Sequence, residues 1–379
     1  MTGALPRVLY VGRARLRFPL ERGLERRYEA LSGELDWRQL GTAAGGEAGS
    51  DRFVLARPFP IGRFDGLVYH LALPFRVRRE LRRFRPDAVV VQGAQETALV
   101  LVARALSRVP TKVILDLHGD WRAPTRLYGS RARRLLDPLA DALARWALRR
   151  ADAVRTITAY TTRLVREEGV ESAAEFPAYM DLAAFTARPV TALPEAPRAL
   201  FVGVLERYKA FDVLAEAWRS VAEQVPEATL RVVGRGALAP LAERLVADLP
   251  GRVEWTPAVS ADGVAAALDA ATVLVLPSRS EGMGRVVVEA GLRGRGVVGS
   301  RVGGIPDVVR DGETGLLVPP EDPRALADAL VRVLTDRALA ERLGAAARAA
   351  AEEWLVSPEE YARRVRDLVE RVVGAPRSA

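Results

Sequence analysis

The chain alternates continuous apolar runs of strand length with segments whose apolar residues recur every three or four positions. This alternation is typical of repeated strand–helix–strand units, so the predicted fold class is α/β with parallel sheets. A glycine-rich stretch, residues 41–50, is expected to be a loop. In the first half, the pattern predicts strands over residues 8–11, 88–92, 111–117 and 153–156, and helices over residues 21–31, 71–84, 94–107 and 131–150.

A second series of the same kind begins at Ala199, with the runs ALFVGVL, LRVVG, TVLVLP and GVVGS. Between the two series, residues 186–197 contain prolines and no periodic pattern, which favours a linker. The predicted domains are therefore residues 1–190 and 191–357, a partition that suits a chain of 379 residues. A last helix is predicted over residues 358–375. Its apolar stripe consists of Tyr361, Val365, Leu368 and Val372.

The most informative motif is SRSEGMGRVVVEAGLRGRGVVGSRVGG, which begins at Ser278. Glu281 follows a predicted strand, and Glu289 lies in a helix that is predicted to begin near Arg285. Carboxylates accept hydrogen bonds from sugar hydroxyls, while free N–H groups at a helix start attract phosphate. The spacing therefore indicates a site for a hydroxyl-rich, phosphorylated ligand. The loop between the two glutamates contains Gly282, Met283 and Gly284.

Two glutamates eight residues apart are common in helical proteins, so the surrounding sequence decides the interpretation. From Phe201 to Leu317 the chain resembles the donor half of the retaining glycosyltransferases of family 4. The resemblance runs through FVGVLERYKAFDVLAEAW, LRVVGRG, the segment from VEWTPAV to GGIPDVV, and DGETGLLVPPED. It implies a GT-B fold, in which two Rossmann-like domains face each other across a cleft and a C-terminal helix crosses back to the N-terminal domain. The second domain is then expected to bind the donor.

The resemblance implies transfer of a sugar from a nucleoside-diphosphate sugar to an acceptor, with retention of anomeric configuration. Glu289 is then expected to hold the ribose hydroxyls, and Glu281 the hydroxyls of the transferred hexose. In the family, an arginine and a lysine neutralise the departing diphosphate in place of a metal ion. We therefore expect neither a metal nor a cofactor, and the donor itself is the expected small-molecule partner.

Lysine is rare in this chain, since only two of the 56 basic residues are lysines. Lys209 follows the VGVL strand and matches the lysine of the family pattern R-x4-K-G, so it is expected to contact phosphate. The chain departs from that pattern, because Val204 occupies the usual arginine position and Ala210 the usual glycine position. Arg207 is expected to supply the missing charge, although an arginine in a solvated loop has the same sequence signature.

Further donor contacts are expected along the second series. Gly234 and Gly236 end a predicted strand, where glycine allows backbone to approach a ligand but is also needed in a tight turn. The resemblance places the segment from Pro257 to Val259 against the nucleobase through main-chain contacts. It also places Gly12, after the first strand, close to the sugar phosphate.

Histidine occurs only twice, and His118 directly follows an apolar strand. That position puts its side chain at the ligand-binding edge of a parallel sheet. The resemblance matches it to a histidine near the reacting sugar, whereas the alternative is a histidine that stabilises a loop. Asp120 lies at the same edge and is expected to orient an acceptor hydroxyl. His70 is expected to be structural.

Charge is distributed unevenly between the two halves. Residues 1–190 carry 32 arginines and lysines against 21 acidic residues, while residues 191–379 carry 24 against 27. The basic half favours an anionic partner, with surface arginine of no specific role as the alternative. Residues 71–87 combine arginines with large apolar side chains, which suits either a helix at an anionic membrane or a helix packed on the sheet. A lipid-linked acceptor, of the kind used for cell-envelope glycans, fits the first interpretation.

No cysteine, no signal-peptide pattern and no apolar run of membrane-spanning length occur in the sequence, so we expect a cytoplasmic enzyme that docks at the inner membrane face.

A sugar-nucleotide epimerase or a phosphorylase-like enzyme keeps the fold but lacks the EGMGRVVVEA segment. A dinucleotide-dependent dehydrogenase is disfavoured because no G-x-G-x-x-G opens either half. A nucleic-acid-binding protein is allowed by the charge, but no recognised binding motif supports it. The donor sugar, its nucleotide and the acceptor stay open.

Overall fold

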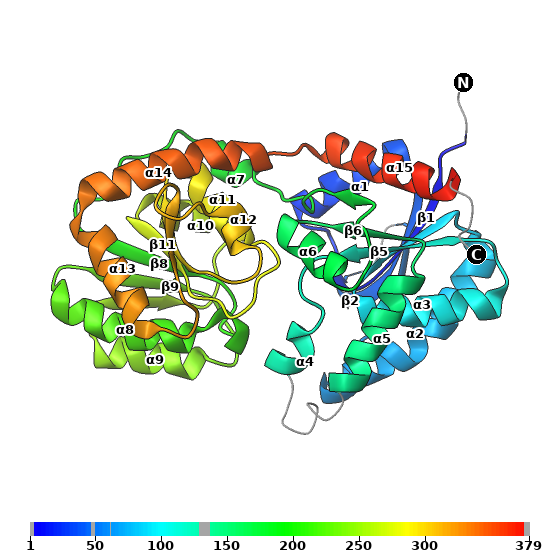
Figure 1. Ribbon diagram of the computed structural model, residues 1–379, viewed down its shortest axis with the longest axis horizontal. Helices are drawn as coiled ribbons and strands as arrows, with labels where there is room; N and C mark the ends of the chain where they lie inside the picture. The colour runs from blue at the N-terminus through cyan, green and yellow to red at the C-terminus, as the bar shows by residue number, and fades with distance from the viewer. Residues whose placement is uncertain (1–3, 47–49, 61, 129–136, 375–379) are drawn as a thin grey trace. The chain divides into compact units, whose positions relative to one another are not determined.

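The computed structural model describes residues 4–46, 50–60, 62–128 and 137–374. The chain divides into two compact units. Unit 1 comprises Met1–Met180 and Val356–Ala379, and unit 2 comprises Asp181–Leu355. Each unit contains one parallel sheet flanked by helices, which confirms the α/β prediction (Figure 1). None of the described helices is long and apolar enough to cross a membrane.

The sheet of unit 1 has the strand order β3-β2-β1-β4-β5-β6-β7, with every registered pair parallel. Its central strands are buried on both sides, as their continuous apolar runs predict. The strands are β1 (Arg7–Arg17), β2 (Asp36–Gly45), β3 (Phe53–Ala56), β4 (Ala88–Gln92), β5 (Lys112–Leu117), β6 (Ala153–Thr156) and β7 (Ala174–Glu175).

The last helix of the chain packs in unit 1 against the first one, as Figure 1 shows for α15 in red beside α1. Tyr361, Val365, Leu368 and Val372 are buried there, which confirms the predicted stripe and the return of the chain to unit 1. The helices of unit 1 are α1 (Arg22–Glu34), α2 (Gly62–Phe84), α3 (Ala94–Ser107), α4 (Ala123–Tyr128), α5 (Asp137–Arg150), α6 (Ala159–Glu167) and α15 (Pro358–Gly374). Residues 131–136 of a predicted helix lie outside the described residues.

The predicted loop over residues 41–50 is wrong in its first half, because β2 continues to Gly45. At Gly41 a Cβ atom would lie only 3.0 Å from the carbonyl oxygen of Ala14, so glycine here allows two paired strands to approach closely. Residues 47–49 lie outside the described residues. The first strand also runs further than predicted, which places Gly12 inside β1 rather than after it.

Helix α2 begins at Gly62, nine residues before the predicted start, and contains Pro74. Four apolar residues of the predicted amphipathic segment pack in the core between this helix and the sheet, namely Leu73, Val77, Leu81 and Phe84. For these four the interpretation of a helix packed on the sheet is correct. Leu71 and Phe75, in contrast, are 64% and 75% exposed.

The sheet of unit 2 has the order β10-β9-β8-β11-β12-β13, again with parallel pairs. Its strands are β8 (Arg198–Val202), β9 (Thr229–Val233), β10 (Val253–Thr256), β11 (Val273–Leu276), β12 (Gly296–Ser300) and β13 (Gly315–Val318). Its α-helices are α7 (Ala183–Thr186), α8 (Phe211–Gln224), α9 (Ala239–Asp248), α10 (Ala261–Asp269), α11 (Arg285–Leu292), α12 (Ile305–Val308), α13 (Pro323–Thr335) and α14 (Arg337–Ala351). Two short 3₁₀ turns are η2 (Arg207–Lys209) and η3 (Glu352–Trp354).

The segment predicted as a linker, residues 186–197, is bound to unit 2. The buried guanidinium of Arg293 donates hydrogen bonds to the carbonyl oxygens of Phe185, Arg188 and Pro189. Arg295 does the same for the carbonyl groups of residues 191 and 192. These bonds explain why the compact units part between residues 180 and 181, ten residues before the predicted boundary.

Candidate functional site

The functional residues predicted in unit 2 follow strands at one edge of its sheet. Because the strands are parallel, their carboxyl ends lie together. The chain passes from β8 outward to β9 and β10, then returns to place β11 on the other side of β8. The order therefore reverses between β8 and β11, and such a switch point is where open α/β sheets bind ligands. Lys209 follows β8, and Glu281 follows β11.

The structure brings Lys209 and Glu281 together. The Lys209 ammonium forms an ion pair with the Glu281 carboxylate, although the two residues are 72 positions apart. The same carboxylate oxygen accepts a hydrogen bond of 2.8 Å from the Ser278 hydroxyl. The two charged side chains are only 13% and 9% exposed. A cation and an oxygen acceptor thus sit side by side at the switch point.

Arg279 holds the turn that carries Lys209, and the sequence analysis missed it. Its guanidinium donates to both carboxylate oxygens of Asp212 at 2.8 Å and to the carbonyl oxygen of Arg207 at 2.6 Å. Its backbone N–H donates to the carbonyl oxygen of Tyr208 at 2.7 Å. These contacts fix η2 against the loop after β11. The only local signal is an arginine directly after Ser278, in the loop that follows β11.

Arg207 is exposed at this turn. Its guanidinium has no hydrogen-bond or ion-pair partner within the described part of the chain. The side chain is therefore an uncommitted cation next to Lys209. Ala210, at the usual glycine position of the family pattern, adopts a left-handed backbone with φ of 51°. The turn thus keeps a backbone conformation typical of glycine, although alanine occupies this position.

The second glutamate lies one turn into α11. Gly284 precedes this helix with φ of 84°, a conformation that favours glycine, and Met283 is buried beside it. The Arg285 guanidinium donates to Glu289 at 2.6 Å and to the carbonyl oxygen of Asp181 at 3.0 Å. Burial raises the pKa of Glu289, and Arg285 offsets part of that rise. Glu289 is thus a buried carboxylate with one exposed partner, in the middle of the helix that begins at the glycine loop.

The remaining predicted donor residues follow β9 and β10. A Cβ atom on Gly234 would lie 1.8 Å from the carbonyl oxygen of Gly203, and one on Gly236 would lie 2.6 Å from that of Leu205. Packing against the loop after β8 is therefore sufficient reason for both glycines. Pro257 and Val259 lie in the loop after β10, where Pro257 is exposed and Val259 is half-buried.

In unit 1, His118 follows β5 and is bound by a buried acid. Its Nε2 lies 2.9 Å from the Asp116 carboxylate, which also pairs with the buried Arg155 guanidinium. Arg155 in turn donates to the carbonyl oxygens of Phe176 and Pro177 at 2.8 and 2.9 Å. Burial alone would raise the pKa of Asp116, but Arg155 and His118 more than offset it and hold that pKa well below its usual range. Asp116 and Arg155 are functional candidates that the sequence analysis missed.

The other two predicted residues of unit 1 have defined surroundings. The Asp120 carboxylate accepts hydrogen bonds from the Arg122 backbone at 2.9 Å and from the Arg122 guanidinium at 2.8 Å. A Cβ atom on Gly12 would lie 3.1 Å from the Gln92 amide oxygen. His70 bridges two helices, since its ring nitrogens contact the Gly66 carbonyl oxygen and the Glu96 carboxylate. In the described ranges no group of three or more histidine, aspartate or glutamate side chains is arranged to hold a metal ion.

Comparison with known proteins identifies both units. Residues 22–175 match the model of the glycosyl transferase 4-like domain, and residues 196–336 match that of the glycosyl transferases group 1. A D-inositol 3-phosphate glycosyltransferase of a Nocardioides species is 40% identical over 212 residues, covering 51% of this chain and 46% of the relative. The sulfoquinovosyl transferase SQD2 of Arabidopsis thaliana is 29% identical over 316 residues, covering 80% and 60%. The matched regions thus span about half the length of these relatives.

Solved structures of the same fold cover nearly the whole chain. Sucrose-phosphate synthase from Thermosynechococcus elongatus superposes with a TM-score of 0.77 at 21% identity, covering 97% of this chain and 99% of that one. HepE of Anabaena, solved in complex with UDP and glucose, gives a TM-score of 0.67 at 17% identity, covering 96% and 99%. These similarities confirm the predicted fold of two Rossmann-like units. The two family models, which together match most of the chain, show that it belongs to the group 1 glycosyltransferases, as the resemblance to family 4 implied.

Proposed function

We propose that this chain transfers a hexosyl group from a nucleoside-diphosphate sugar to an acceptor, with retention of configuration. The observation that carries the proposal is the contact of Glu281 with Lys209 and Ser278 at the switch point of unit 2. A diphosphate needs a cation and a hexose needs a hydrogen-bond acceptor, and this contact offers both. The glycine-preceded start of α11, which is suited to phosphate, follows directly in the chain.

Each charged residue of unit 2 has a distinct role in this proposal. Glu289 holds the ribose hydroxyls, while Glu281 holds hydroxyls of the hexose. Lys209, Arg207 and the N–H groups at residues 282–285 stabilise the charge that develops on the departing diphosphate. Pro257, Val259, Gly234 and Gly236 line the nucleotide through backbone, and Gly12 of unit 1 approaches the sugar phosphate.

Donor binding exchanges ion pairs that are already present. Phosphate oxygens take the place of Glu281 beside Lys209, which frees the carboxylate to accept hydrogen bonds from the sugar. Ribose hydroxyls likewise compete with Arg285 for Glu289. Each of these side chains therefore keeps a hydrogen-bond partner when the donor enters: Lys209 binds phosphate oxygens, and the two carboxylates accept hydrogen bonds from hydroxyls.

In the transfer step, the bond between the anomeric carbon and the diphosphate oxygen breaks and the acceptor oxygen bonds to the same face of that carbon. The acceptor oxygen is itself the nucleophile, so no side chain is assigned that role, and the acceptor proton leaves with the diphosphate. The Nε2 atom of His118 donates a hydrogen bond to Asp116, so its Nδ1 atom is the one left to accept a hydrogen bond. In this proposal Nδ1 contacts a hydroxyl of the reacting sugar. Asp120 orients the acceptor hydroxyl from the same edge of the sheet.

The test is a transfer assay on the purified chain with UDP-, GDP- and ADP-sugars, with and without excess EDTA. We expect one donor to be consumed at nearly the same rate in EDTA, because cationic side chains replace a metal ion. Activity that disappears in EDTA and returns with magnesium or manganese would contradict the metal-independent mechanism. A thermal-shift panel of the same donors beside duplex DNA separates this function from nucleic-acid binding.

We further propose that the acceptor is lipid-linked and that unit 1 docks on an anionic membrane. Helices α2, α3 and α5 are neighbours in unit 1 (Figure 1), and they carry most of the exposed large apolar side chains of the described residues. We call this surface the α2–α3–α5 face. Its apolar members are Leu67, Val68, Leu71, Phe75, Val102, Leu106, Leu139, Leu143 and Trp146.

Arginines stand beside these apolar side chains. A groove of about 440 Å³ is lined by Phe75 together with Arg78, Arg79, Arg82 and Arg83. Exposed apolar side chains next to cations match the boundary between lipid tails and anionic headgroups. This combination supports a membrane over a nucleic acid, since nucleic acid would not require Leu71 and Phe75.

A further inference from the structure

Unit 1 contains a cavity of about 210 Å³ at the carboxyl ends of its central strands. It opens because β1 stops pairing with β4 at Val11 and shifts its register against β2 before Arg15. Four elements contribute side chains to its wall, namely β1, α1, β2 and β4. Its polar lining comes from Tyr10, Arg15, Arg27, Tyr28, Gln39 and Gln92.

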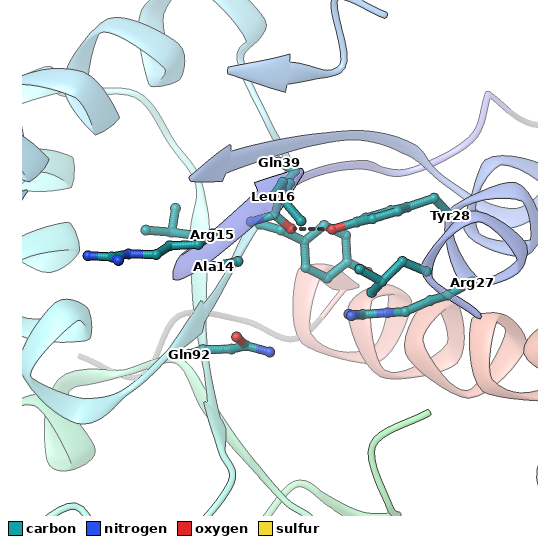
Figure 2. A pocket seen from close by; sticks show the side chains of 10 residues that line it. Ala14, Arg15, Leu16, Arg27, Tyr28, Gln39 and Gln92 are labelled. Atoms are coloured by element: carbon teal, nitrogen blue, oxygen red, sulfur yellow. Dashed lines mark hydrogen bonds between the residues drawn. The ribbon is translucent and has the colours of Figure 1, made fainter. Parts of the chain in front are cut away.

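Half of these polar groups already bind one another or their surroundings. Tyr28 and Gln39 share a hydrogen bond of 3.3 Å, drawn as a dashed line in Figure 2, and the Gln39 amide donates to the Leu40 carbonyl oxygen at 3.1 Å. Arg15 pairs with Asp65 at 2.6 Å. The binding capacity that remains belongs to Tyr10, Arg27 and Gln92.

These three side chains lack polar partners within the described part of the chain. Among the described residues no carboxylate lies within ion-pairing distance of Arg27, which instead faces the rings of Tyr28 and Tyr361 at 5.7 and 5.5 Å. Its Nε and the Tyr10 hydroxyl are buried without a hydrogen bond. Figure 2 shows the side chains of Arg27 and Gln92 extending toward each other from opposite sides of the cavity.

All three side chains can donate hydrogen bonds, and Arg27 adds a positive charge. Burial raises the pKa of Tyr10 well above its usual range, so its hydroxyl stays protonated and able to donate. Buried donors without partners are costly, and a guanidinium is suited to binding two oxygens of one phosphate. The chemistry of the cavity therefore matches a small oxyanion, not a neutral sugar.

We propose that this cavity binds the phosphoryl group of a phosphorylated acceptor, with Arg27 as its principal ligand and Gln92 and Tyr10 as further donors. That the ligand is the acceptor rests on the proposed function, whereas binding of the phosphoryl group does not. A lipid headgroup and a free polyol phosphate present the same group to this cavity.

The test measures binding to the full chain by calorimetry in the absence of donor. The probes are inorganic phosphate, glycerol 3-phosphate and glycerol. We expect the first two to bind and glycerol not to bind. Arg27→Gln should weaken phosphate binding about tenfold or more, because a charge-assisted hydrogen bond is lost. Gln92→Leu should weaken it by a smaller factor, and Arg22→Gln, an exposed arginine of the same helix, should leave it unchanged.

Two further measurements separate loss of binding from loss of folding or function. UDP affinity reports on unit 2 and should be equal in Arg27→Gln and wild type. Vesicles that contain phosphatidate compete with glycerol 3-phosphate only if the headgroup enters the cavity. The inference is overturned if wild type binds no phosphate, or if Arg27→Gln binds it as well as Arg22→Gln does. Arg27-dependent phosphate binding without consumption of any nucleotide sugar would overturn the proposed function and leave the inference standing.

Discussion

The two units treat their charged side chains differently, although both are built on the same kind of parallel sheet. At the switch point of unit 2, Lys209 is paired with Glu281, and Glu289 with Arg285. In the cavity of unit 1, Arg27 and Gln92 have no polar partner among the described residues. Paired charges suit a ligand that brings both phosphate and hydroxyls, because its phosphate can bind the cation of a pair and its hydroxyls can bind the carboxylate. Unpaired donors suit a ligand that brings negative charge alone.

The difference lies in the side chains that line the two candidate sites, not in the sheets that carry them. The sheets of both units have buried, continuous apolar strands, and the candidate sites lie at their carboxyl ends. In unit 2 the candidate binding residues are held by other residues of the site, as Arg279 holds the turn of Lys209. The predictions below test whether paired and unpaired charges have these separate purposes.

The largest effect is expected at Lys209. Lys209→Ala should lower kcat by about 10²–10³, as removal of one stabilising donor does in other enzymes. Lys209→Arg keeps the charge and should retain more activity, and Arg207→Gln should lose less. Steady-state kinetics at saturating donor measure all three. Equal losses in Lys209→Ala and Arg207→Gln would mean that the paired lysine has no special part in turnover.

The next largest effect concerns the stability of unit 1. Asp116→Asn leaves the buried Arg155 without its counter-charge and should lower the free energy of unfolding by about 3 kcal/mol. The lowered pKa of Asp116 also fixes a pH dependence. Ionised Asp116 stabilises the fold fully at pH values above its pKa in the unfolded chain, which is about 3.9. This stabilisation is lost as the pH falls toward its lower pKa in the folded chain.

Urea unfolding of wild type and variant at neutral and acidic pH measures both parts of this prediction. The difference in the free energy of unfolding between wild type and Asp116→Asn should decrease as the pH falls below about 3.9. Asp120→Asn, at the same edge of the sheet, is the control and should cost about 1 kcal/mol, because only its bonds with Arg122 are lost. If this difference in the free energy of unfolding did not change with pH, the ionised form of Asp116 would not stabilise the fold.

The two glutamates of unit 2 should differ in kinetics. Glu289→Gln should raise the donor KM about tenfold, because ribose is held equally before and during the reaction, while Glu281→Gln should also lower kcat. The pKa of Glu289 is raised by burial, so its ionisation opposes folding as the pH rises past the unfolded value. Glu289→Gln should therefore be no less stable than wild type at pH 7. Normal kinetics in both variants would contradict the assignment of the donor site.

Membrane docking is a smaller effect that is spread over many side chains. Wild type should sediment with vesicles that contain phosphatidylglycerol and be released by salt, since each arginine contributes about 1 kcal/mol near an anionic surface. Leu71→Glu and Phe75→Glu should each weaken this binding. Val373→Glu, an exposed apolar residue of α15, is the matched control. Binding that is equal for neutral and anionic vesicles, or absent from both, would leave the α2–α3–α5 face without this partner.

The smallest effect is expected at Ala210. Its left-handed backbone costs about 1 kcal/mol that glycine would not incur. Glycine, however, loses a buried methyl group and more chain entropy on folding. Ala210→Gly should therefore change the free energy of unfolding by less than about 1 kcal/mol and leave donor binding intact. Thermal unfolding of the full chain, with and without UDP, measures both the stability and the donor binding of the variant.

Sequence patterns located most of the sheet but failed where composition was ambiguous. The apolar run of β4 placed this strand at its observed bounds, because a strand buried on both faces admits few polar residues. The predicted bounds of β6 are also correct, although its four residues include Arg155 and Thr156. Residues 41–45 were predicted as loop because glycine and alanine carry no strand signal. Their extended conformation comes from pairing with the neighbouring strands, which the local sequence does not encode.

Local sequence patterns were enough to predict the two series of strands and helices, the amphipathic stripe of the last helix, and the glycine loop between Glu281 and Glu289. These features depend on residues that are near one another in the chain. The pairing of Lys209 with Glu281, and the link that Asp116 makes between His118 and Arg155, could be seen only in the folded chain. The tertiary structure also decided that Arg27 and Gln92 share a cavity. The members of most of these pairs lie many residues apart, and strand order in the folded sheet, not spacing along the chain, brings such groups into contact.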